Sequence, residues 1–538
     1  MIIRNKPPRK LALHEPIRHE NHGRPRSRRD FLGRGLITGA AYITAPTFFS
    51  LFANPRLAEA KLANDIQTLA QDCGIVTQGA GKIPFIAFDL AGGANLNGSE
   101  ALIGGQGGQL DFLTAAGYAN LGLPGDMVPN APNPKSPTNN WIDTSLGLAW
   151  HSDGGMLRGI LSRTAVGTRA GVNGAVIPAL SENDTMNNPH SPLYGIAMTG
   201  SNGALLTLIG SEPTVSGGNS VAPADMINPT LQPTVVDQAS DVTGLVNTGQ
   251  LGTLFTNPSD AVAVLESIER ISGGTDPSAF GGKLGQVNML TRDTAIKTAL
   301  RCGYVKSADL VDTFGDPSTL NPNLDKNIVG SGGIFSQTEY ASNSDYQTTG
   351  AIMKMVINGF AGAGTIEMGG FDYHGQGRAT GEDRNFQAGV CIGACLEYAA
   401  RVGMPLMLYI FSDGSLNANG MVDNTPDGRG KFMWASDNQT TAASIILVYN
   451  PKGRPVLLHG ATSQQIGFYD SGGSVDTTGS PAANSVEQLV ETVILNYMAL
   501  HGTQGQFGTL FPNHGLGSAA GQDAVTAFAP IVNGTIGA

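Results

Sequence analysis

Short apolar segments alternate with segments of helical periodicity along much of the chain, and this alternation limits the folds that the chain can adopt. Apolar segments that predict buried strands lie at residues 83–89, 203–209, 406–411 and 444–449. Strands that alternate with helices are typical of an α/β fold, in which a mostly parallel sheet is covered by helices on both faces. The sequence therefore predicts a sheet whose strand ends gather along one edge.

The remaining expected elements fit this pattern. Residues 259–272 predict an amphipathic helix, with Ser259 as its N-cap and Gly273 beyond its end. The others are helices at 293–303, 346–360, 384–402 and 485–500, and short strands at 365–368 and 456–458.

Residues 61–538 are predicted to form a single large α/β domain. This stretch exceeds the ~250–300 residues of a usual single core, unless long loops enlarge the domain. Two regions rich in Pro, Asn and Gly, near 124–140 and 211–245, are predicted to be such loop insertions, and they are also candidate boundaries.

The N-terminus has the three parts of a signal peptide in order. A basic region ends in Arg28 and Arg29, an apolar stretch follows at 35–53, and Ala58-Glu59-Ala60 predicts cleavage after Ala60. Adjacent arginines mark the twin-arginine type, so residues 1–60 predict export by the twin-arginine machinery to the periplasm or outside the cell. The alternative is an uncleaved anchor, because the apolar stretch is near the ~20 residues that span a bilayer. Its Gly, Pro, Ser and Thr residues make it weakly apolar and favour cleavage, and no further span follows.

The charge of the chain excludes some partners. The net charge is −11 overall, and the predicted leader carries +7, which leaves −18 for residues 61–538. Such an acidic domain offers no electrostatic surface for nucleic acid or anionic lipid. The negative charge either attracts cations, divalent metals included, or serves solubility alone.

Four cysteines in a chain of this length do not predict a disulfide scaffold. Cys391 and Cys395 are four positions apart on a predicted helix, so their side chains share a face. They could form a metal-binding pair, a disulfide or part of the apolar packing, and we favour packing.

Polar side chains stand at the ends of the predicted strands. Asp372, His374 and Asp413 follow strands, and Asp437 precedes one. The predicted helix at 384–402 makes a right-handed crossover that returns the chain to the same edge of the sheet, where ligands of α/β proteins bind. We expect these four side chains to converge and to hold a divalent metal: Zn²⁺, Mn²⁺, Ca²⁺ or Mg²⁺. Ordinary turn chemistry is the alternative, because Asp favours loop starts.

The order of these motifs resembles a known family. The leader, the Gly-Gly turn at 92–93, Gly-Gly-Phe-Asp-Tyr-His at 369–374 and Phe-Ser-Asp-Gly-Ser at 411–415 together resemble domain-of-unknown-function family 1501, a family of exported bacterial proteins. That family is similar to the alkaline phosphatase and sulfatase superfamily. The resemblance covers most of residues 83–460 and implies a three-layer α/β sandwich with metal ligands at the strand ends.

The resemblance also assigns individual positions. Asp372, His374 and Asp437 match ligand motifs of the family. Asn95 stands where the family carries Asp, and Asn438 where it carries His, which makes both of them candidate binding residues.

Two functions follow from the resemblance. One is metal-dependent hydrolysis of phosphate or sulfate esters, for which no nucleophile can be named, because the chain has no G-x-S-x-G elbow. The other is a non-catalytic binding or assembly role in the periplasm or at the cell surface. The second is favoured by Asn438, because an amide is a weaker zinc ligand than imidazole.

Overall fold

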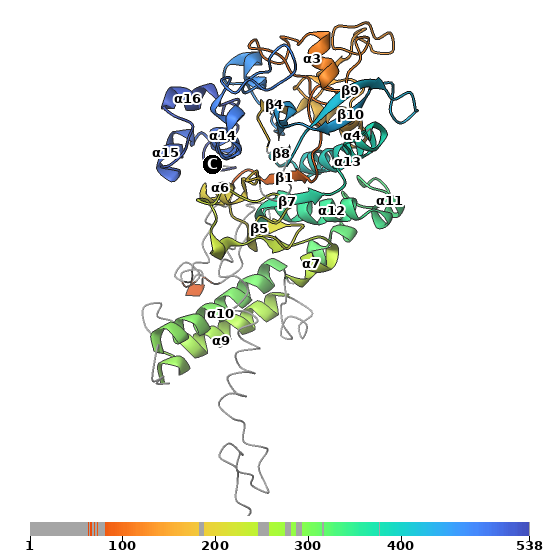
Figure 1. Ribbon diagram of the computed structural model, residues 1–538. Helices are drawn as coiled ribbons and strands as arrows, with labels where there is room; N and C mark the ends of the chain where they lie inside the picture. The colour runs from red at the N-terminus through yellow and green to blue at the C-terminus, as the bar shows by residue number, and fades with distance from the viewer. Residues whose placement is uncertain are drawn as a thin grey trace, which may run out of the picture.

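A seven-stranded sheet forms the centre of the molecule (Figure 1). The computed structural model describes residues 81–181, 188–245, 258–274, 281–286, 293–314, 317–375 and 377–536, together with Ala63, Asp65, Ile66, Leu69 and Cys73. The predicted leader with Arg28, Arg29 and Ala60 lies outside the described residues. In spatial order the strands are β4 (Val172–Pro178), β11 (Ala443–Tyr449), β8 (Leu406–Ser412), β1 (Phe85–Leu90), β7 (Ala361–Met368), β5 (Leu206–Gly210) and β6 (Thr234–Val235).

The sheet is mostly parallel, with one reversed strand. β1 pairs in parallel with both β7 and β8, and β5 is parallel to β7 and β6. β11 is antiparallel to β8 and β4, which differs from the parallel sheet expected from its apolar sequence. A strand buried on both faces is apolar throughout in either direction, so its composition does not reveal its orientation.

The connection from β8 to β11 explains the reversal. The chain leaves β8 and forms an antiparallel hairpin of β9 (Leu416–Val422) and β10 (Phe432–Asp437) before it enters β11. A parallel return would need a crossover that carries the chain to the opposite edge. Because the hairpin stays at the carboxyl edge of β8, the start of β11 lies at that edge as well.

Helices pack on both faces of the sheet, an arrangement compatible with a three-layer sandwich. On one face, α12 (Ser344–Ile357), α13 (Arg378–Val402) and α4 (Gly155–Arg163) join the core that contains Ile86 and Phe88 of β1. On the other face, α14 (Val486–Leu500) and α6 (Leu193–Met198) pack against Phe85 and Ala87. The alternation of side chains along β1 thus supplies both cores.

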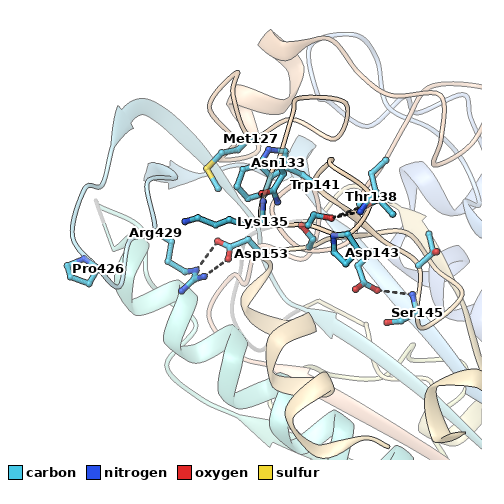
Figure 2. Close-up of a pocket in the computed structure, with 15 residues that line it drawn as sticks. Met127, Asn133, Lys135, Thr138, Trp141, Asp143, Ser145, Asp153, Pro426 and Arg429 are labelled. Carbon is cyan, nitrogen blue, oxygen red and sulfur yellow. Dashed lines mark hydrogen bonds and ion pairs between the residues drawn. The ribbon is translucent and has the colours of Figure 1, made fainter. Parts of the chain in front are cut away.

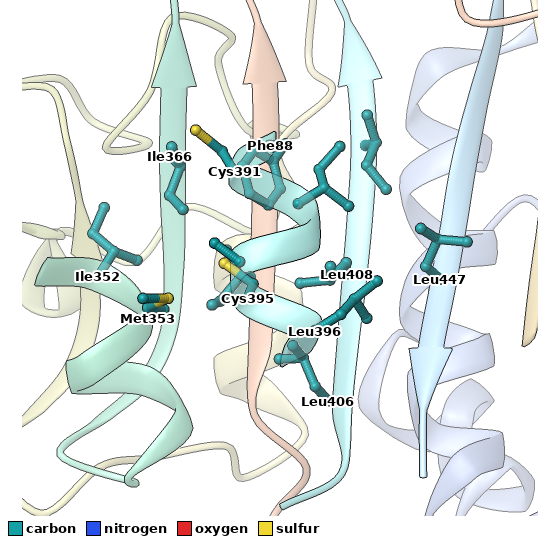
Figure 3. Close-up of a cluster of buried hydrophobic side chains, with 14 of the residues drawn as sticks. Phe88, Ile352, Met353, Ile366, Cys391, Cys395, Leu396, Leu406, Leu408 and Leu447 are labelled. Carbon is teal, nitrogen blue, oxygen red and sulfur yellow. The ribbon is translucent and has the colours of Figure 1, made fainter. Parts of the chain in front are cut away.

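Cys391 and Cys395 belong to α13 and lie on its face that packs into the core. Both thiols are unpaired and fully buried beside Phe88, Ile366 and Leu408 (Figure 3). The interpretation of these cysteines as packing residues is confirmed.

Glycines let α13 approach α4 closely. A Cβ at Gly159 of α4 would lie 2.1 Å from the carbonyl oxygen of Phe386, and one at Gly389 of α13 would lie 2.1 Å from that of Met156. Any larger residue would push the two helices apart.

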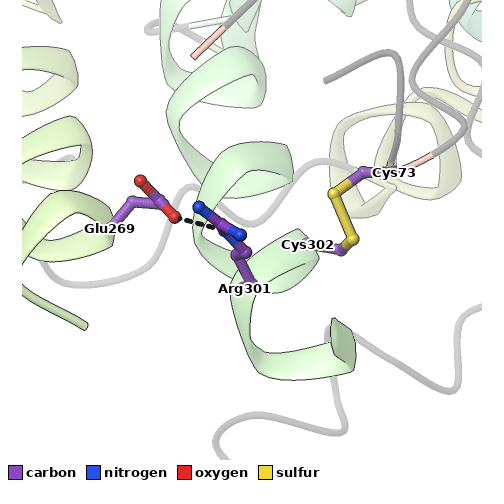
Figure 4. Close-up of a disulfide and its surroundings, with 4 residues drawn as sticks. All are labelled: Cys73, Glu269, Arg301 and Cys302. Atoms are coloured by element: carbon purple, nitrogen blue, oxygen red, sulfur yellow. Dashed lines mark hydrogen bonds and ion pairs between the residues drawn. A yellow bond between two sulfur atoms is a disulfide. The ribbon is translucent and has the colours of Figure 1, made fainter. Parts of the chain in front are cut away.

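A helical hairpin of α9 (Pro258–Gly273) and α10 (Asp293–Phe314) extends from the side of the sheet near β5 and α7 (Ala239–Gly244) (Figure 1). The predicted helix at 259–272 is confirmed, but it begins before Ser259 and includes Gly273, so Ser259 is not its N-cap and Gly273 does not lie beyond its end. Helix α10 is longer than the predicted 293–303. A disulfide joins Cys302 of α10 to Cys73, and beside it Arg301 donates a 2.8 Å hydrogen bond to Glu269 of α9 (Figure 4).

The two predicted insertions differ in structure. Residues 124–140 are free of helix and strand, whereas 211–245 contribute β6, α7 and a segment that covers the carboxyl end of β1. The smaller elements are β2 (Ile142–Asp143), β3 (Trp150–His151), α3 (Ala115–Asn120), α5 (Val166–Ala170), α11 (Gln337–Ser342), α15 (Phe507–Leu510) and α16 (Ala519–Ala524). Within the described ranges, every helix is too short or too polar to span a membrane.

Candidate metal centre

Three of the four predicted metal ligands lie together. Each of Asp372, His374 and Asp437 offers one ligand atom, and these atoms all lie within 4.8 Å of one another. The Nδ1 atom of His374 pairs with Oδ1 of Asp372 and lies 3.8 Å from Oδ1 of Asp437. All three side chains are about half exposed or more, so a cation could reach them from solvent.

The antiparallel hairpin brings Asp437 to the other two residues. Asp372 and His374 follow β7, and Asp437 is the last residue of β10. The backbone N–H of Gly375 donates a 2.9 Å hydrogen bond to the carbonyl of Ala435, which fixes the loop after β7 against β10. If β11 were parallel, the segment that precedes it would lie at the opposite edge.

The Gly-Gly turn after β1 links the trio to Asp413. The N–H of Gly92 donates a 2.8 Å hydrogen bond to Oδ1 of Asp413. On its other side, a Cβ at Gly92 would lie only 2.4 Å from the backbone nitrogen of Asp372, and its φ of +121° suits glycine alone. Gly92 therefore lies against both Asp372 and Asp413.

Asp413 lies outside the trio because its carboxylate is used in the fold. It is buried, Oδ1 accepts from Gly92, and Oδ2 accepts a 3.0 Å hydrogen bond from the Asn219 amide. Its backbone carbonyl accepts from Ser181 and Asn188. The structure thus brings together Asp372, His374 and Asp437 and places Asp413 behind them.

Two further carboxyl groups, which are not among the predicted metal ligands, lie near Asp413. Asp89 of β1 is buried, and Glu367 of β7 is mostly buried; burial, reinforced by nearby carboxylates, raises the pKa of each to about 7. Ser220 donates to Asp89 from its N–H at 2.7 Å and from its hydroxyl at 3.3 Å, which partly offsets the effect of burial. The sequence signal that identifies Asp89 and Glu367 is a charged residue inside an otherwise apolar strand, because a buried charge needs partners.

The two asparagines serve the local fold. The buried Asn95 accepts from Ser99 and donates to Asn97, and its N–H donates to the hydroxyl of Tyr373. The Oδ1 atom of Asn438 accepts from both the N–H and the hydroxyl of Thr440, so it caps the turn that follows β10.

The chemistry of the trio fits a divalent cation. Two carboxylates and one imidazole are ligands that zinc and manganese accept, and calcium or magnesium would bind through the carboxylates. Above about pH 7, where the buried carboxyl groups of Asp89 and Glu367 lose their protons, they make the electrostatic potential at this edge more negative, which favours a cation.

Comparison with known proteins finds no relative. No protein-family model, no curated protein and no solved structure matches this chain.

Proposed function

We propose that this protein is exported by the twin-arginine route and is a metal-dependent hydrolase of phosphate or sulfate esters on an alkaline phosphatase/sulfatase-like fold. The observation that carries the proposal is the convergence of Asp372, His374 and Asp437 at the edge of the sheet where α/β proteins bind ligands. The resemblance to family 1501 supports the same edge and the same residues.

The roles of the residues follow from their exposure. Asp372, His374 and Asp437 would hold the cation at the surface, within reach of a soluble ester. Zinc, manganese, magnesium or calcium would supply Lewis-acid polarisation of the ester group. Gly92 and Asp413 would set the position of the loop that carries Asp372, because Gly92 contacts both.

The disulfide supports export independently of the leader. Disulfides persist in oxidising compartments such as the periplasm and are rare in the cytosol. The bond between Cys73 and Cys302 is therefore what an exported protein would carry.

A non-catalytic binding or assembly role is the second candidate. The pairing of His374 with Asp372 and the capping role of Asn438 favour this role, because these side chains then stabilise surface turns. Ser412, which adjoins Asp413, donates to the carbonyl of Leu90 and accepts from Ala94, so its hydroxyl serves the fold and is not a free nucleophile.

Metal binding by purified variants tests the first proposal. We expect the protein to bind about one zinc or manganese ion by calorimetry and elemental analysis. Loss of an outer-shell partner already lowers metal affinity about 10–100-fold, so Asp372→Ala and His374→Ala should lower it by at least that much.

The matched control is Asp523→Asn. Asp523 and His459 form another exposed Asp–His pair, 3.2 Å apart, which is no part of the trio. This variant should bind metal like the wild type.

Aryl phosphates and aryl sulfates are then assayed with and without metal. Metal-free wild type, or equal binding by all variants, would contradict the proposal and leave the non-catalytic role; metal binding without turnover of either ester would favour a binding role for the same centre.

A further inference from the structure

A cavity of about 660 Å³ lies away from the proposed metal centre, between the 124–145 region and the turn that joins β9 to β10 (Figure 2). Asp372, His374 and Asp437 are not among its lining residues. Small-molecule sites usually measure about 300–1,000 Å³, so the cavity is large enough for a ligand of several rings. The function proposed above leaves it unused.

One wall of the cavity is an immobilised aromatic ring. The indole of Trp141 stacks on the buried imidazole of His151, with 5.3 Å between ring centroids and 8° between their planes. Its Nε1–H donates a 2.9 Å hydrogen bond to the carbonyl of Asp126. With one face packed and its N–H occupied, the ring is held in place before any ligand arrives, which lowers the entropy cost of binding.

The rest of the lining is rich in neutral polar groups. Five hydroxyl side chains line the cavity: Ser136, Thr138, Thr144, Ser145 and Ser152. The hydroxyls of Ser136 and Thr138 lie 2.9 Å apart, and Thr138 donates to Oδ1 of Asn140 at 2.7 Å, so both are already oriented. A hydroxyl both donates and accepts, and therefore matches another hydroxyl in either role.

The charges in the lining cancel. The positive charges of Lys135 and Arg429 are balanced by the negative charges of Asp143 and Asp153, and Arg429 forms a forked ion pair with the carboxylate of Asp153. In Figure 2 this ion pair lies at the left, whereas Thr138 and Asp143 lie at the right. A cavity without net charge gives no electrostatic preference for a phosphate, a sulfate or a cationic ligand.

We infer that this cavity binds a neutral saccharide. A sugar ring has an apolar C–H face, which would pack on the indole of Trp141, and equatorial hydroxyls, which would donate to the hydroxyl oxygens of Ser136 and Thr138 and exchange hydrogen bonds with Asn133. A neutral saccharide matches the aromatic wall, the hydroxyl-rich lining and the zero net charge of the cavity. The site is independent of the metal centre.

Tryptophan fluorescence tests the inference directly. The chain has three tryptophans, and Trp150 and Trp434 are buried, so Trp141 is the one that solvent and ligand can reach. Purified protein is titrated with neutral hexaoses of glucose (α- and β-linked) and of N-acetylglucosamine, and with oligogalacturonate and inorganic phosphate as charged probes. We expect at least one neutral hexaose to shift the emission to shorter wavelength and to protect it from acrylamide.

Variants locate the binding. Trp141→Ala should lower the affinity measured by calorimetry at least about tenfold, and Thr138→Ala should lower it less. Trp141→Phe keeps a ring against His151 and should restore part of the affinity, so loss of folding in Trp141→Ala would not obscure the result. Lys135→Ala removes an exposed charge of the same lining and should leave the affinity for a neutral sugar within about twofold. Binding of the charged probes alone, no binding of any hexaose at millimolar concentration, or equal binding by wild type and both Trp141 variants would overturn the inference.

Discussion

At the scale of single residues, Gly92 has the most demanding position in the candidate site. Its φ of +121° excludes L side chains, and a Cβ there would collide with the backbone of Asp372. Gly420 has a positive φ of +77° but open space around the position of a Cβ atom. A substitution there therefore reports the free-energy cost of the backbone conformation alone.

The comparison of Gly92→Ala with Gly420→Ala is therefore informative. We expect Gly420→Ala to lower the free energy of unfolding by about 1 kcal/mol. Gly92→Ala should lower it by more than about 3 kcal/mol and should weaken metal binding, because Asp372 must move. Chemical denaturation and calorimetry of both variants check this expectation, and equal losses would show that the contact with Asp372 is unimportant.

Asp89 gives a prediction about pH. Burial raises its pKa from 3.8 to about 7, so between these values the folded protein keeps a proton that the unfolded chain has released. The contribution of Asp89 to stability is therefore lost as the pH rises through this range, and above about pH 7 the carboxylate is buried in its charged form. At about 1.4 kcal/mol per pKa unit, the cost is at most roughly 4 kcal/mol.

Asp89→Asn should remove this cost. An amide keeps an oxygen for the N–H of Ser220 and never ionises. We expect the gain in unfolding free energy, relative to wild type, to be larger at pH 8 than at pH 5, measured with a chelator present so that bound cations do not contribute. A gain that is the same at both pH values would contradict the account.

At the scale of elements, five strands of the sheet could be predicted at least in part, including 203–209 for β5 and 365–368 for β7, whereas β4 and β6 could not. The segments 83–89, 406–411 and 444–449 correspond to β1, β8 and β11, because a continuous apolar run signals burial on both faces. β4 has Asn173 and Gly174 within it and ends in Pro178, so its composition favours a loop. The segment 456–458 contributes only an isolated bridge between Leu457 and Phe528.

The candidate site was predictable to a similar extent. Asp372, His374 and Asp437 were found because they adjoin strand ends, although for Asp437 the reasoning assumed a parallel strand. Only the antiparallel direction of β11 puts the residue before it at the right edge. Asp413 adjoins a strand end too, but whether its carboxylate faces solvent or Gly92 depends on tertiary contacts that local sequence does not contain.

The disulfide gives a prediction at the element scale. Cys302→Ser should loosen α9 and α10, because a disulfide stabilises by about 2–5 kcal/mol. In hydrogen exchange, amides of α10 should exchange faster while those of β1 and β8 keep their protection. Cys391→Ala is the matched control: it removes a sulfur from the sheet core and should affect α13 instead of the hairpin. Unchanged exchange in α10 would show that the hairpin is held by its other contacts.

At the scale of the whole molecule, export is the property to test. Arg28→Lys together with Arg29→Lys should abolish export, because the adjacent arginines define the signal. Precursor should accumulate in the cytoplasm, whereas the exported wild type should begin at or near Lys61. Normal periplasmic yield of the double variant would contradict the twin-arginine route, and an intact leader in the membrane fraction would favour the anchor.

The central place of β1 has a consequence for folding. β1 is the first strand of the sheet along the chain, yet Phe85 pairs with Ala363 and Met407, which are synthesised much later. Until β7 and β8 exist, β1 is an apolar segment with both edges open, the kind of segment that aggregates or occupies chaperones. Pairing across such long separations in sequence is slow. The sheet therefore closes only after β11, which ends at Tyr449, has been made, and fragments that end before β7 should be insoluble.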